Sequence, residues 1–193
     1  MKTSNTKTIV GVGLLTAIVV VLQALAVFIR PSGIFTISLV LVPIVVGAAL
    51  YGWKAGAWLG LVFGVIVLIT DAAAFLAINV PGTVITVLAK GILCGLAAGA
   101  VYRLLAARNR VVAVVAAAVV CPCVNTGVFL LGCLVFFMPT INEWAAASGY
   151  ASAGAYMILA LVGINFLIEM AVNIVLSSAI VQIIKVGKNT VTD

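Results

Sequence analysis

Residues 83–105 read TVITVLAKGILCGLAAGAVYRLL, and Lys90 is the only charged residue in this run before Arg103. A helix of this length extends about 35 Å, enough to cross the roughly 30 Å hydrocarbon core of a bilayer. Transmembrane β-strands are shorter and alternate apolar with polar residues. The length and continuity of the run therefore predict a transmembrane helix.

The composition of the whole chain agrees with this prediction. Of its 193 residues, 66% are hydrophobic and 7% are charged, and the mean hydropathy is +1.42. Soluble domains carry about 25% charged residues, so these few charges cannot cover a surface in water. Lipid must surround most of the chain. We predict an all-α integral membrane protein, a compact helical bundle that forms a single domain over residues 1–193.

Turn-forming clusters such as RPSG (30–33) and NVPG (79–82) divide the chain into about six apolar runs. Residues 139–154 are more polar and are read as a loop. The predicted spans are residues 8–28, 34–50, 55–70, 83–105, 111–138 and 155–184.

The distribution of Lys and Arg among the loops predicts the topology, because cytoplasmic loops are enriched in these residues. One side of the predicted bundle receives only Arg30. Both termini are therefore expected in the cytoplasm. The other side receives eight basic residues: Lys2, Lys7, Lys54, Arg103, Arg108, Arg110, Lys185 and Lys188.

Polar side chains inside the predicted spans are the candidate functional residues, since charges in hydrocarbon are costly. Lys90 lies in the fourth span and Asn125 in the fifth. Asn165, Glu169 and Asn173 are four residues apart in the sixth span, so they share one helix face.

Two interpretations of these residues stay open at the level of sequence. Lys90 and Glu169 pair only to join two helices, or they line a polar cavity that holds a small solute. In the second case Lys90 would meet an anionic group, and Asn125 and Asn165 would donate and accept hydrogen bonds. The loops on the outer side add Asn79 and Trp144 as further candidate substrate-binding residues, although tryptophan is common as an interfacial anchor.

The sequence gives no sign of catalysis, of a metal site or of ATP binding. It has no His, no Ser/His/Asp set and no phosphate-binding glycine loop. Cys121 and Cys123 flank Pro122, but no His or second Cys pair completes a metal site. Basic residues punctuate the apolar runs instead of forming one patch, which argues against nucleic-acid binding. We expect a non-enzymatic protein that binds no metal and no cofactor.

Small residues four apart recur in the predicted helices and allow close helix packing in lipid. The ladders Gly56/Gly60/Gly64 and Gly91/Gly95/Gly99 are interpreted as internal packing. The pair Gly13/Ala17 is more open to binding a partner.

The local pattern over the first three spans resembles the substrate-binding S-components of energy-coupling factor (ECF) vitamin transporters. It comprises GLLTAIVVVLQAL (13–25) and SLVLVPIVVGAALYGWKAGAWLGLVFG (38–64), which includes Pro43 and the turn from Gly52 to Gly56. Size, six predicted spans and cytoplasmic termini extend the resemblance over nearly the whole chain.

The resemblance implies a subunit that binds a water-soluble vitamin from outside with high affinity. Its implied partners are a transmembrane T-component and two cytoplasmic ATPases, which use the ATP. Small residues of the first span contact the T-component in this family, and the matching positions are Gly13 and Ala17. Family pockets lie where Lys90, Asn125, Asn165 and Glu169 are expected.

The resemblance leaves several ligands and two other functions open. Nickel and cobalt S-components use an N-terminal His, which this chain lacks, so an organic ligand is expected. Lys90 favours a carboxylate-bearing vitamin such as pantothenate or folate, and riboflavin stays open. The main alternative is a proton-coupled secondary transporter with Glu169 as proton carrier, and another is a structural bundle.

Overall fold

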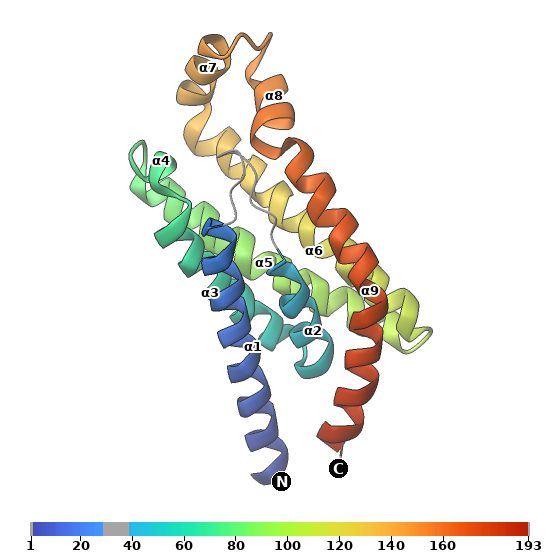
Figure 1. Cartoon of the computed structure of the whole chain (residues 1–193). Helices are drawn as coiled ribbons and strands as arrows, with labels where there is room; N and C mark the ends of the chain where they lie inside the picture. The colour runs from blue at the N-terminus through green and yellow to red at the C-terminus, as the bar shows by residue number, and fades with distance from the viewer. Residues whose placement is uncertain (1, 29–38, 193) are drawn as a thin grey trace.

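The computed structural model describes residues 2–28 and 39–192, and these residues form helices with no β-strand (Figure 1). The elements in chain order are α1 (Lys2–Phe28), α2 (Leu41–Tyr51), α3 (Trp53–Thr70), α4 (Ala73–Leu76), α5 (Val80–Ala106), α6 (Arg110–Gly132), the π-helical segment η1 (Cys133–Phe137), α7 (Met138–Ala147), α8 (Ala153–Tyr156), the π-helical segment η2 (Met157–Val162) and α9 (Gly163–Thr192).

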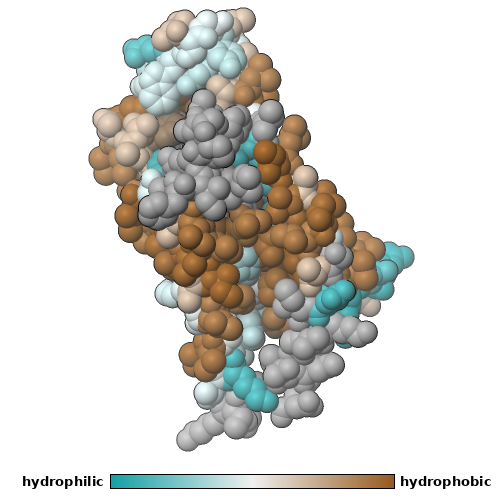
Figure 2. Space-filling view, viewed as in Figure 1, coloured by the Kyte–Doolittle hydropathy of each residue, from teal (hydrophilic) through white to brown (hydrophobic). Residues whose placement is uncertain are grey.

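Four helices in the described residues are long and apolar enough to cross a membrane: Thr6–Ala26, Trp53–Thr70, Val80–Ala106 and Arg110–Ala147. A bent pair, Ala153–Val162 and Asn165–Ser177, makes a fifth span if it is counted as one. Apolar side chains cover the middle of the molecule, whereas hydrophilic ones gather toward its ends (Figure 2). Leu14 and Val135, for example, are 64% and 71% exposed. The protein is therefore an all-α membrane protein, as predicted.

Two asparagines begin the helices that form the α5–α6 hairpin. The Asn79 side chain accepts a hydrogen bond from the backbone N–H of Gly82 at 2.9 Å, and Pro81 follows in the first turn of α5. The Asn109 side chain accepts from the N–H groups of Val111 and Val112 at the start of α6. Both caps satisfy N–H groups that a helix leaves unpaired at its first turn.

Glycines bring α3 and α5 into backbone contact. Gly60 faces Gly91, and Gly56 faces Gly95, so closely that a Cβ at any of the four would collide with the facing carbonyl oxygen. Gly64 meets the carbonyl oxygen of Val87 in the same way. The predicted internal packing of both glycine ladders is thereby confirmed, and the contacts show that α3 and α5 run antiparallel.

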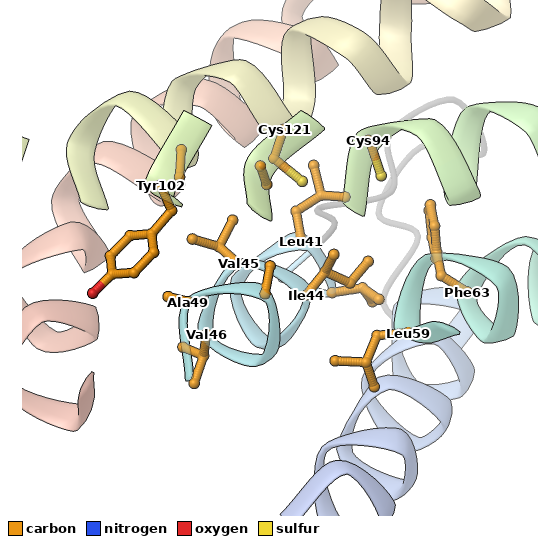
Figure 3. Close-up of a cluster of buried hydrophobic side chains, with 14 of the residues drawn as sticks. Leu41, Ile44, Val45, Val46, Ala49, Leu59, Phe63, Cys94, Tyr102 and Cys121 are labelled. Atoms are coloured by element: carbon orange, nitrogen blue, oxygen red, sulfur yellow. The ribbon is translucent and has the colours of Figure 1, made fainter. Parts of the chain in front are cut away.

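Helix α2 lies in the core of the bundle. Leu41, Ile44 and Val45 are fully buried, and Figure 3 shows α2 between Leu59 of α3 and Cys121 of α6. An 11-residue helix is about 16 Å long, and apolar helices of this length are typical of a buried core. Because most residues of α2 are buried, the helix has no polar face. The predicted span over residues 34–50 is described only from residue 39 onward, so six complete spans remain a prediction.

The polar segment predicted as a loop over residues 139–154 is largely helical, and this part of the prediction is wrong. Pro139 lies in the first turn of α7, where a missing N–H breaks no hydrogen bond, and alanines continue the helix. The segments α6, η1 and α7 follow one another without a loop from Arg110 to Ala147, and these 38 residues exceed the roughly 20 that a bilayer core requires. The polar residues therefore lie on a helical extension beyond the apolar segment.

The last predicted span is bent by 43° near Gly163, whose φ of +37° is rare for residues with a side chain. The two chain ends lie at the same end of the molecule in Figure 1. Their common position agrees with the predicted topology, and the cytoplasmic assignment stays a prediction.

A candidate ligand-binding cavity

A cavity of about 300 Å³ lies among α1, α3, α5, α6 and α9, toward the end of the bundle away from the chain termini. Its volume falls at the lower limit of small-molecule sites. Four of the predicted site residues line it: Lys90, Asn125, Asn165 and Glu169.

The α5 side of the cavity is formed by residues that share one helix face. Thr83, Thr86 and Lys90 are three and four positions apart, and all three line the cavity. The Lys90 ammonium lies 5.6 Å from the ring centre of Phe63 and 5.5 Å from that of Phe129. Two aromatic faces therefore hold the cation by cation–π attraction without neutralising its charge.

Helices α6 and α9 supply the opposite wall. Asn125 is 7% exposed and Glu169 is 6% exposed. Glu169 lines the same cavity as Lys90. Asn173, one turn further along α9, donates to the backbone oxygen of Glu169 at 2.8 Å and lies outside the cavity lining.

Several buried polar atoms around the cavity have no hydrogen-bond partner among the described residues. They are Gln23 Oε1, Thr86 Oγ1, Asn125 Oδ1 and Asn165 Oδ1, and each belongs to a residue that lines the cavity. A buried polar group without a partner costs about 1–3 kcal/mol. Because all four residues line the same cavity, the cavity is suited to a polar solute with several hydrogen-bonding groups.

Comparisons with known proteins agree with this architecture. The family model described as "ECF transporter, substrate-specific component" matches residues 7–181. The chain belongs to this family. This S-component is also 27% identical over 206 aligned positions to the pantothenic acid transporter PanT of Lactococcus lactis subsp. cremoris (strain MG1363), covering 98% of this chain and 99% of that protein. No solved structure gave a significant match.

The family resemblance noted in the sequence is thereby confirmed. The family is a class of transporter component and not a class of enzyme, and the apolar helices place the S-component in a membrane.

Packed aromatic rings form part of the cavity lining. Phe75 packs edge-on against Phe129 at 5.7 Å and against Phe137 at 5.0 Å, and all three line the cavity. The predicted site residue Trp144 packs on Phe75 at 5.8 Å, one ring away from the cavity lining. Asn79 also lies outside the lining and caps α5. A ligand-binding role for the six predicted residues stays a prediction.

Gln23 and Asp71 also line the cavity, although neither is among the predicted site residues. The Gln23 Nε2 donates to Asp71 Oδ2 at 2.7 Å, and Thr70 donates to the same oxygen at 2.8 Å. Gln23 is the one amide within the predicted first span, and Asp71 directly follows the predicted third span. The rule that intramembrane polar residues mark functional sites applies to Gln23.

The two predicted docking residues lie on the outer face of α1. Gly13 and Ala17 are both exposed, and nothing lies within 4 Å of the position that a Cβ of Gly13 would take. Leu14 and Ile18 are exposed beside them. This small-residue surface is accessible for helix packing, and contact with a T-component stays a prediction.

Proposed function

We propose that this S-component captures a water-soluble vitamin, with pantothenate favoured over folate and riboflavin, and delivers it to an ATP-driven ECF importer. The observation that carries the proposal is the cavity, where the Lys90 cation and buried amides face a common space. The family match supports a substrate-binding role, and the pantothenic acid transporter of L. lactis supports the choice of ligand.

Lys90 would bind the vitamin's carboxylate. The ammonium group is held between two rings and shielded from bulk water, where a charge-assisted hydrogen bond is stronger than in water. Glu169 would hold Lys90 in place by its opposite charge, and Asn125 and Asn165 would bind amide or hydroxyl groups of the ligand.

Transport would require partners, because this chain carries no ATP-binding motif. A T-component would dock on Gly13 and Ala17, and two cytoplasmic ATPases would hydrolyse the ATP. The setting would be a bacterial plasma membrane, with no cofactor on this chain.

The test is calorimetric titration of the purified chain, without ATP, with pantothenate, folate and riboflavin in turn. Sub-micromolar binding of pantothenate alone would support the proposal. Preferential binding of another of the three would reassign the ligand and keep the binding role. Binding of none would contradict the vitamin-capture function.

A further inference from the structure

One polar pair in the cavity wall has no part in recognising a carboxylate. Gln23 is 2% exposed, and its Nε2 donates to Asp71. A carboxylate accepts hydrogen bonds and donates none when ionised, so the amide nitrogen must face Asp71 and Oε1 must be the remaining group. That oxygen is buried, has no partner among the described residues, and belongs to a cavity-lining side chain.

A second hydrogen bond also joins α1 to α3, so joining these two helices does not by itself explain the Gln23–Asp71 pair. Trp58 Nε1 donates to Thr16 Oγ1 at 3.2 Å, and neither residue lines the cavity. This hydrogen bond already joins the two helices at the surface. A link whose sole purpose was to join them would not need a buried acceptor at the cavity.

The helix register places Gln23 and Asp71 far from Lys90 along the bundle. Gly60 of α3 packs on Gly91 of α5, and the helices are antiparallel. Asp71 lies eleven residues beyond Gly60, whereas Lys90 is adjacent to Gly91, so about 15 Å of helix axis separates their backbones. The Lys90 side chain covers part of this distance, because side chains on a helix lean toward its N-terminus.

The Lys90 ammonium attracts an anionic group in surroundings where charge interactions are stronger than in bulk water. An elongated ligand with a carboxylate at one end therefore has a favoured orientation, with that carboxylate at Lys90.

Resting on the proposed function, we propose that Gln23 and Asp71 form a second pole of the same site, which binds the uncharged hydrogen-bond donors of the ligand. The ligand lies lengthwise, with its carboxylate at Lys90 and a hydroxyl or amide N–H donating to Gln23 Oε1. Gln23 is a specificity-determining residue, selecting molecules that carry a donor at the end remote from the carboxylate.

The experiment titrates the purified full chain with three probes: pantothenate, its alcohol analogue panthenol, which lacks the carboxylate, and a dideoxy analogue with both hydroxyls replaced by hydrogen. In Gln23→Met, pantothenate and panthenol should each bind roughly 5- to 10-fold more weakly than in the wild type. The dideoxy analogue should bind both proteins equally. Thr16→Val, which removes the other α1–α3 hydrogen bond, should bind all three probes as the wild type does.

The wild-type protein also tests the pole without any substitution, which matters if Gln23→Met does not fold. Removal of both hydroxyls from pantothenate should weaken its binding by at least the same factor. Equal affinity for pantothenate and the dideoxy analogue would overturn the pole. So would a Gln23→Met protein that loses the same factor for all three probes, since that pattern reports only a structural link. If the wild type binds no pantothenate, the proposed ligand is wrong and the pole fails with it.

Discussion

At the scale of the residue, the Lys90 side chain decides whether the cavity recognises an anion. Lys90→Met keeps most of the side-chain volume and removes the charge. We expect pantothenate binding to weaken by about 2–5 kcal/mol, or at least roughly 30-fold, because the carboxylate would be buried without its partner. Isothermal titration of the purified protein measures the change.

Lys54→Met is the matched control for this substitution. Lys54 lies 5.6 Å from the Trp53 ring at the exposed start of α3, outside the cavity, so its loss should leave the affinity unchanged. Equal affinities for the wild type and Lys90→Met would remove Lys90 from the site.

Glu169 poses the separate question of whether its charge serves the ligand or only Lys90. Glu169→Gln keeps the shape of a residue that is 6% exposed and removes a negative charge from the cavity that Lys90 also lines. If Glu169 positions the lysine, the thermal midpoint without ligand and the pantothenate affinity should both fall. Glu143→Gln, on the exposed face of α7, should change neither. A lower midpoint with unchanged affinity would support a purely structural ion pair.

Part of the site was predictable from single residues and part was not. Lys90, Asn125, Asn165 and Glu169 stand out because each is a polar interruption in an apolar run. Sequence alone places them at similar depth but does not show that Gln23, which precedes Lys90 by 67 residues, lines the same cavity. That proximity depends on how α1 packs beside α3, which no local pattern encodes.

At the scale of the element, the backbone contact between α3 and α5 holds together two of the helices that line the cavity. Gly60→Ala places a methyl group against the carbonyl of Gly91, where backbone and not a flexible side chain must move. We expect a loss of about 1–3 kcal/mol in stability and a lower midpoint of thermal unfolding in detergent.

Gly127→Ala provides the comparison for Gly60→Ala. Gly127 lies within α6 with nothing within 4 Å of its missing Cβ, so alanine should stabilise that helix by up to about 1 kcal/mol. Similar midpoints for the two variants would show that the glycine contact does not limit stability.

Substitutions on the outer face of α1 should affect uptake and not ligand binding, because this face points away from the cavity. Gly13→Leu and Ala17→Leu should leave pantothenate affinity unchanged and abolish uptake by cells that contain the partner subunits, since bulk on this face blocks close helix packing. Ala171→Leu, on the exposed side of α9, should retain uptake. Normal uptake by both α1 variants would exclude this face as the docking surface.

The existence of the long helices was predicted more accurately than the positions of their ends. The apolar runs indicated α1, α3, α5 and α6 correctly, because a continuous run long enough to cross a bilayer has few other solutions. The polar composition of residues 139–154 suggested a loop, but α7 extends past the apolar segment as a helix. The predicted span over residues 34–50 is described only from residue 39 onward, and the described part contains the short, mostly buried helix α2.

At the scale of the whole molecule, binding and transport should separate. The cavity lies within one chain, so pantothenate should bind without ATP, whereas movement across the membrane should require the T-component and the ATPases. Proteoliposomes containing the chain alone should bind labelled pantothenate and accumulate none, with or without an imposed proton gradient. Adding the partner subunits, with ATP on the side of the membrane where the ATPases lie, should start accumulation. Proton-driven accumulation by the chain alone would instead identify a secondary transporter, and Glu169→Gln would then be expected to abolish it, since Glu169 is a buried carboxylate in the cavity lining.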